Sequence, residues 1–149
     1  MLEPGCYSCE HNLAPDPPPR EAIVNTPHWR VVHAFNSALP GWLVLLPLRH
    51  VTALDELSDD ELTELGLLQG RVSAALREVV GCVKTYSMLY AEAEGFAHLH
   101  VHLVPRMADQ PEDRKGPAVF GYLAHPESEW VPAEDMDRIA LEVGSRVSL

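Results

Sequence analysis

The sequence has no run of 18 apolar residues, so no segment is long enough to serve as a transmembrane helix. Basic side chains are also scarce, because 11 Lys and Arg stand against 22 Asp and Glu, for a formal net charge of −11. This balance argues against nucleic acid or an anionic membrane as a partner, since both require positive patches. A small phosphorylated ligand remains compatible with it, because a few local donors are enough to bind one.

Cysteine is rare as well, with three residues in the chain. The N-terminus has no basic region followed by an apolar stretch, so it does not resemble a signal peptide, and we expect a cytoplasmic protein. In a reducing compartment these cysteines are not expected to form a disulfide framework. Cys6 and Cys9 stand in C-x-x-C spacing, whereas Cys82 lies in an apolar stretch and is expected to be a small buried residue.

The chain length of 149 residues fits one domain, residues 1–149. Ser58 and Glu61 form a capping-box pattern before a helical apolar periodicity that Gly81 is expected to end. A second helix is expected over 133–143. Strands are predicted over 29–35, 42–46, 84–93 and 98–104, the first two as a hairpin. The Pro-rich part of segment 1–20, residues 11–20, and the polar residues 106–118 are expected to be irregular. This order predicts an α+β fold with a mainly antiparallel sheet.

The most informative segment is His98-Leu99-His100-Val101-His102-Leu103-Val104-Pro105. Because side chains alternate along a strand, the three histidines are expected to share one face that borders a cleft. Three imidazoles so arranged can bind a metal ion, or one of them can act as a nucleophile between two orienting neighbours.

This segment resembles the H-φ-H-φ-H-φ-φ signature of the histidine triad (HIT) superfamily, where φ is apolar. Upstream, residues 39–51 (LPGWLVLLPLRHV) resemble the family's second motif, a Pro-Gly-His and apolar run that ends in Pro-x-Arg-His. The resemblance covers roughly residues 6–107 and implies a HIT-like fold, with the long helix and a C-terminal helix packed on the sheet. It also implies a homodimer.

The resemblance implies that His100 attacks the α-phosphorus of a nucleotide and forms a covalent nucleotidyl-histidine. His102 would bind phosphate oxygens, and Asn36 would contact the ribose. Trp29, Val31 and Phe35 are candidates for the base pocket and equally good core residues. Arg106, with Arg114 and Lys115 after it, could meet distal phosphates. The implied substrate is a purine nucleotide or dinucleoside polyphosphate, with diadenosine polyphosphates favoured by Arg106 after the triad.

Two departures from the family pattern stand out. The hydroxyl that often precedes the triad is missing from residues 93–97, so the leaving-group proton would come from water, His102 or Glu94. The family's Pro-Gly-His is Pro40-Gly41-Trp42 here, so no role carries over to Trp42.

A structural zinc ion is also expected, because two thiols and nearby histidines suit a Cys2His2 site. The resemblance to zinc-containing relatives implies the ligands Cys6, Cys9, His50 and His98, and His11, His28 and His33 are reserve candidates. If His98 were not a ligand, it would orient the neighbouring imidazole. A redox pair is the competing interpretation of the C-x-x-C, but it usually opens a helix, which the Pro-rich segment does not predict.

Three alternatives to a hydrolase remain open from the sequence. A nucleotidyltransferase would differ only in the acceptor that resolves the intermediate. A noncatalytic, zinc-stabilised nucleotide-binding module would not need the His100 imidazole. A metal enzyme would use His98, His100 and His102 together as ligands.

Overall fold

The computed structural model describes residues 2–149 and contains a five-stranded antiparallel sheet in the order β1-β2-β3-β5-β4. The strands are β1 (Val24–Asn25), β2 (Trp29–His33), β3 (Leu43–Pro47), β4 (Lys84–Leu89) and β5 (Val101–Arg106). Strands β2 and β3 form the predicted hairpin, in a register that pairs Val31 with Leu45. The α+β fold class with an antiparallel sheet is therefore confirmed.

The long helix α2 (Asp59–Val80) forms where the sequence predicts it. The Ser58 side chain accepts a hydrogen bond from the Glu61 backbone, and the Glu61 carboxylate accepts one from the Ser58 backbone, which completes the capping box. Gly81 ends the helix at φ +72°, a left-handed conformation that glycine adopts without strain.

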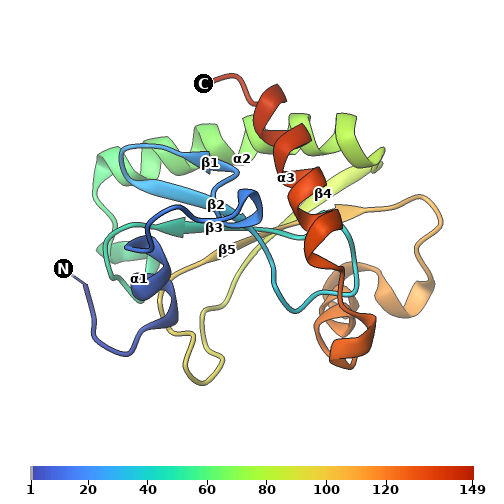
Figure 1. Ribbon diagram of the computed structural model, residues 1–149, viewed down its shortest axis with the longest axis horizontal. Helices are drawn as coiled ribbons and strands as arrows, with labels where there is room; N and C mark the ends of the chain where they lie inside the picture. Colours follow the sequence, from blue (N-terminus) through green and yellow to red (C-terminus); the bar gives the residue numbers. More distant parts are fainter. Residues whose placement is uncertain (1) are drawn as a thin grey trace.

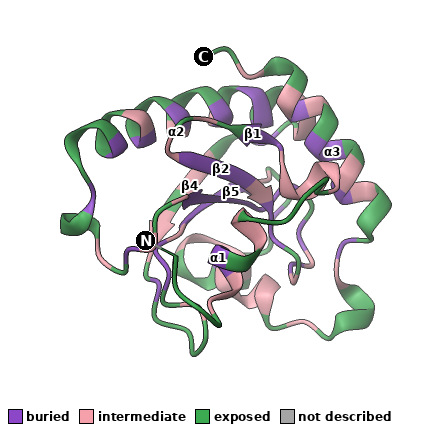
Figure 2. Cartoon of the chain, turned by 60° about the vertical axis from the view of Figure 1, so that its left-hand side comes forward, coloured by how far each residue is buried: buried purple, intermediate pink, exposed green. Residues whose placement is uncertain are grey.

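Helices α2 and α3 (Ala133–Arg146) pack on one face of the sheet, and α2 runs above the sheet in Figure 1. Below the sheet in that view lie the short helix α1 (Tyr7–Asn12) and the 3₁₀ helices η4 (Gly116–Leu123) and η5 (Glu127–Glu129). Burial is concentrated in the central strands (Figure 2). The chain therefore leaves the second face partly open between these short elements, and the candidate site lies there.

Several predicted boundaries are wrong. Strand β5 begins at Val101, not at 98, because Pro47 on the neighbouring strand has no N–H to continue the ladder, and the Leu99 N–H bonds to the Val51 carbonyl instead. Strand β4 ends at Leu89, short of 93. Residues 106–118 are not one irregular loop, because Arg106 closes β5 and the 3₁₀ helices η3 (Glu112–Arg114) and η4 follow.

The N-terminal region is more regular than predicted. Helix α1 continues to Asn12, and a 3₁₀ helix, η1 (Pro19–Glu21), begins in the Pro-rich segment. Proline at the first positions of η1 costs nothing there, because the first N–H groups of a helix have no intrahelical partner. A further 3₁₀ helix, η2 (Leu54–Glu56), precedes α2. Within residues 2–149, none of the helices combines the length and apolarity needed to cross a membrane.

Candidate active site and metal centre

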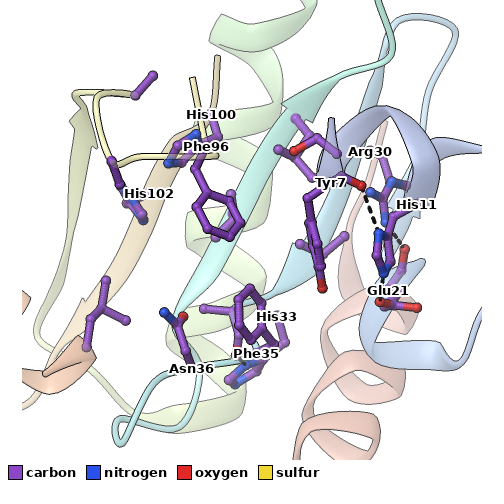
Figure 3. A pocket seen from close by; sticks show the side chains of 18 of the residues that line it. Tyr7, His11, Glu21, Arg30, His33, Phe35, Asn36, Phe96, His100 and His102 are labelled. Carbon is purple, nitrogen blue, oxygen red and sulfur yellow. Dashed lines mark hydrogen bonds and ion pairs between the residues drawn. The ribbon is translucent and has the colours of Figure 1, made fainter. Parts of the chain in front are cut away.

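His100 and His102 line a cavity of about 300 Å³ on the second face of the sheet. Figure 3 shows both imidazoles at one end of this cavity, with Phe96, Phe35 and Tyr7 along it and Arg30, His11 and Glu21 at the other end. The two rings are 4.9 Å apart between centroids and nearly perpendicular.

The His100 ring is held in one tautomer. Its Nδ1 lies 2.8 Å from the His98 carbonyl oxygen, which can only accept a hydrogen bond, so Nδ1 carries the proton. In the neutral imidazole Nε2 therefore has a free lone pair. An imidazole lone pair at the wall of a cavity is a competent nucleophile near neutral pH.

The His102 ring is held in the opposite tautomer by a different partner. Trp42 donates from Nε1 to His102 Nδ1 at 3.0 Å, and because indole can only donate, the proton of neutral His102 lies on Nε2. Burial, with a smaller contribution from His100, lowers the pKa of His102 to about 4. His102 is therefore a neutral N–H donor at neutral pH.

His98 does not share a face with the other two histidines, contrary to the prediction from strand alternation. Residues 98–100 precede β5, so the period of two does not apply to them, and His98 is 2% exposed and turned toward the cysteines. Its Nδ1 lies 3.5 Å from the sulfurs of both Cys6 and Cys9.

The sulfurs of Cys6 and Cys9 and ring nitrogens of His50 and His98 all lie within 4.8 Å of one another. The His50 and His98 Nδ1 atoms are 3.2 Å apart, and Cys9 Sγ is 3.4 Å from His50 Nδ1. For tetrahedral zinc, bonds of about 2.3 Å to sulfur and about 2.05 Å to nitrogen give edges of roughly 3.3–3.8 Å. The four donors therefore fit zinc in both chemistry and spacing.

The surroundings orient these donors for a cation. His98 donates from Nε2 to the Pro47 carbonyl at 2.9 Å, so its Nδ1 lone pair faces the cluster. Burial lowers the pKa of His98 and raises the pKa of the Cys9 thiol. A metal ion would supply the charge that a buried thiolate needs.

Arg49 ties the segment that carries His50 to the start of α2. Its guanidinium donates to the Glu61 carboxylate at 2.8 Å and to the Glu56 carbonyl at 2.8 Å. The hydrogen bond from Arg49 is the main cause that lowers the pKa of Glu61 to about 2. In the second motif, Arg49 thus holds the segment against the start of α2, and His50 supplies a candidate metal ligand.

The reserve ligands are engaged elsewhere. His11 contacts the Tyr7 carbonyl, His28 pairs with Glu64, and His33 accepts from the Gly41 N–H. Within residues 2–149, the Cys6 cluster is the one group of His, Cys or acidic side chains with metal-binding spacing, so the structure does not support a three-histidine metal site. The C-x-x-C does open a helix, α1, contrary to the prediction, but the two imidazoles beside the thiols favour a metal centre over a redox pair.

Only some of the predicted substrate-binding residues line the cavity. Asn36 and Phe35 line the cavity, and within residues 2–149 no hydrogen bond engages the Asn36 side chain. Trp29 and Val31 do not line it, because they are fully buried in the core beneath α2.

The predicted phosphate-binding cations lie outside the cavity lining. Arg106 bonds to the Met107 carbonyl, Arg114 lies over the Tyr122 ring, and Lys115 pairs with Glu112. Glu94 is exposed and also outside the lining. His102 is neutral, so it can donate a hydrogen bond but has no acidic proton to transfer, and water is the remaining one of the three predicted sources of the leaving-group proton.

Sequence reasoning missed several residues of the cavity. Tyr7 and Phe96 form its aromatic wall with Phe35, at ring separations of 5.4–6.2 Å, and Arg30 lies at the far end. Arg30 follows Trp29 in a predicted β-strand. A charged residue on a strand with one buried face is unusual, and this was the signal that could have identified Arg30 as a cavity residue.

Comparison with known proteins agrees with this fold and with the family motifs. The model of the HIT domain matches residues 18–109. The fold is similar to that of a histidine triad protein from Bradyrhizobium japonicum, with TM-score 0.70 and 21% identity over 85% of this chain and 90% of that one. A Zn-bound histidine triad family protein from Mycobacterium smegmatis aligns with TM-score 0.67 and 17% identity, over 94% of this chain and 93% of that one. A diadenosine triphosphate hydrolase from Plasmodium falciparum aligns with TM-score 0.64 and 17% identity, over 85% and 75% of the two chains.

Proposed function

This chain belongs to the HIT family, since the model of that domain matches more than half of its length, and we propose that it is a nucleotide hydrolase that uses His100 as its nucleophile. The observation that carries the proposal is the bond from His100 Nδ1–H to the His98 carbonyl, which leaves Nε2 unprotonated at the cavity wall. The substrate class is a purine nucleotide with a phosphate leaving group, such as a dinucleoside polyphosphate.

The proposed reaction has two displacements at the α-phosphorus. His100 Nε2 forms an N–P bond as the bond from phosphorus to the bridging oxygen breaks, and the remaining nucleoside polyphosphate leaves and takes up a proton from water. Water then attacks phosphorus, the N–P bond breaks, and the nucleoside monophosphate is released with a free His100. His102 Nε2–H is placed to donate to a nonbridging phosphate oxygen, where negative charge is redistributed during both steps. Asn36 would contact the ribose.

The Cys6, Cys9, His50 and His98 cluster is proposed to hold a structural zinc ion. All four positions of a tetrahedral site are then filled by the protein, which leaves none for substrate. His98 is two residues from His100 and its carbonyl holds the His100 ring, so the metal centre would fix the position of the nucleophile rather than take part in the reaction.

The test is intact-protein mass spectrometry after brief incubation with diadenosine or diguanosine tetraphosphate. Wild type is expected to gain the mass of one nucleotidyl group, which is a nucleoside monophosphate less one water, and to consume the substrate, whereas His100→Ala does neither. His28→Ala is the matched control, because His28 pairs with Glu64 outside the cavity and should react like wild type.

The outcomes separate the candidate activities. An adduct that is released faster when inorganic phosphate is added would indicate a transferase. No adduct and no nucleotide consumption in wild type would contradict an enzyme and favour a binding module.

A homodimer is also part of the proposal. Strand β4 lies at an edge of the sheet, and Leu67 on α2 is 55% exposed, so an edge strand and an apolar side chain of the long helix are free for a second copy. Light scattering coupled to size-exclusion chromatography should give twice the mass of 16.5 kDa, and a single-chain mass would contradict the dimer.

A further inference from the structure

The far end of the cavity contains a buried cation that makes no direct ion pair with any described residue. Arg30 is 6% exposed, and its Nε donates to Asn12 Oδ1 at 2.7 Å while Nη1 donates to the Glu21 carbonyl at 2.8 Å. Both acceptors are neutral, and among residues 2–149 Arg30 forms no ion pair and Nη2 has no hydrogen-bond partner. A buried charge of this kind is costly unless something else satisfies it.

Arg30 faces the same cavity as His100. Arg30 pairs with Leu46 across β2 and β3, and His100 directly precedes Val101, which pairs with the neighbouring Leu45. His100 and Arg30 are thus about two strand spacings apart across the sheet, or roughly 10 Å. Figure 3 shows the aromatic residues between these two ends. A nucleotide with its α-phosphate at His100 would bring the outer edge of its base to Arg30.

A carboxylate lies close enough to this cation to act on it: burial lowers the pKa of Arg30, and the charge of Glu21 partly offsets that effect without a direct ion pair. Glu21 lines the same end of the cavity, and its Oε1 lies 3.7 Å from His11 Nε2. The subsite therefore offers donors from Arg30 and an acceptor from Glu21.

We propose that this subsite selects guanine over adenine, with Arg30 donating to O6 and N7 and Glu21 accepting from N1–H and the 2-amino group. Arginine pairs with these two guanine acceptors in a bidentate manner, whereas adenine places an amino donor where guanine has O6. Adenine would also direct its unprotonated N1 at the carboxylate, and no hydrogen bond can form because both groups are acceptors. The inference rests on the proposed nucleotide chemistry at His100, and it replaces the adenine preference expected from the sequence.

The test measures binding separately from catalysis. Calorimetry with GMP and AMP is done on the His100→Ala protein, and we expect GMP to bind at least about tenfold more tightly. Adding Arg30→Met should weaken GMP by about ten- to a hundredfold, the range for loss of a bidentate base contact. AMP affinity should change less than about threefold.

Arg20→Met is the matched control. Arg20 also lines the cavity, but two hydrogen bonds to the Asp137 carboxylate satisfy its charge, so the GMP-to-AMP ratio should stay unchanged. Arg30→Lys keeps the charge and loses the planar fork, so it should recover less than the full preference. Thermal melting of each variant reports whether the fold is retained.

Three results would overturn the inference: equal or tighter binding of AMP, tighter binding of UMP than of GMP, or an equal loss of both purines in a folded Arg30 variant. These results are distinguishable from failure of the hydrolase. A guanine preference without a nucleotidyl adduct in wild type would contradict the proposed hydrolase and support the guanine subsite. Equal binding of AMP and GMP, with equal adduct formation from adenine and guanine substrates, would support the hydrolase and contradict the guanine subsite.

Discussion

Trp42 donates from its indole Nε1 to Nδ1 of His102 at 3.0 Å, across two neighbouring strands and 60 residues of sequence. Trp42 stands where the family pattern has histidine, and the sequence assigned it no role. In the proposed mechanism this contact makes Trp42 a positioning residue, because it would act on the substrate only through the tautomer of His102.

Trp42→Phe should therefore lower kcat about tenfold with little change in KM, since one hydrogen bond of about 1–1.5 kcal/mol is lost and the ring packing is kept. Steady-state kinetics with the better dinucleoside tetraphosphate measures this. Nitrogen NMR of His102 should also show its Nε2–H tautomer in wild type and a mixture in the variant.

The matched control for that variant is Trp29→Phe. Trp29 is equally buried and donates to the Glu61 carbonyl at 2.9 Å, but it lies in the core beneath α2. It should lose stability and keep kcat. A similar loss of kcat in both variants would mean that Trp42 acts only through packing.

Two buried histidines should resist protonation. Burial is the main cause that lowers the pKa of both His33 and His102 to about 4, against about 6.5 in the unfolded chain. The unfolded state then binds more protons between these values, so folding stability should fall as pH decreases from about 6.5 toward 4. Proton–carbon NMR should show no titration of either ring from pH 7.5 to 5.5. A midpoint near 6.5 for either ring would contradict the prediction.

Cys9→Ser should abolish stoichiometric zinc and lower the melting temperature, because the buried Cys9 thiol is one of the four proposed ligands and a bound metal would tie α1 to the rest of the fold. Elemental analysis of the purified protein measures the metal. Cys82→Ser is the control, since Cys82 is buried but remote from the cluster and should keep its zinc. His100→Ala should also keep zinc, and its loss there would contradict a metal site separate from the nucleophile.

Glu61→Gln should lower the free energy of unfolding by about 1–2 kcal/mol at pH 7, because charge-assisted bonds to Arg49 are weakened at a buried carboxylate. Its pKa of about 2 lies below the unfolded value of about 4.5, so this stabilisation is full above pH 4.5 and is lost as pH falls toward 2. Urea unfolding at pH 7 and pH 3 should show a smaller difference at pH 3. Glu112→Gln, at an exposed ion pair, should have little effect at either pH.

Local patterns were sufficient for some elements. The capping box and apolar spacing placed α2 to within a residue, and turn residues 36–41 predicted the β2–β3 hairpin. The predicted start of β5 was wrong because it depends on Pro47 of another strand. Helix α1 was missed because its buried residue Cys9 contacts His50 and His98, which are far away in the sequence. Such nonlocal contacts leave no periodicity in the segment itself.

By itself, the sequence determined the family motifs and the long helix, because spacing and residue chemistry are local properties. The four candidate metal donors were predicted only through the family resemblance that these motifs carry. Only the tertiary structure decided that His98 turns from the cavity, that Trp42 orients His102, and that Arg30 and Tyr7 line the same cavity as His100. These relationships join segments far apart in the chain. They follow from the register of the sheet and from where α1 packs, so their physical basis is the packing of the whole fold.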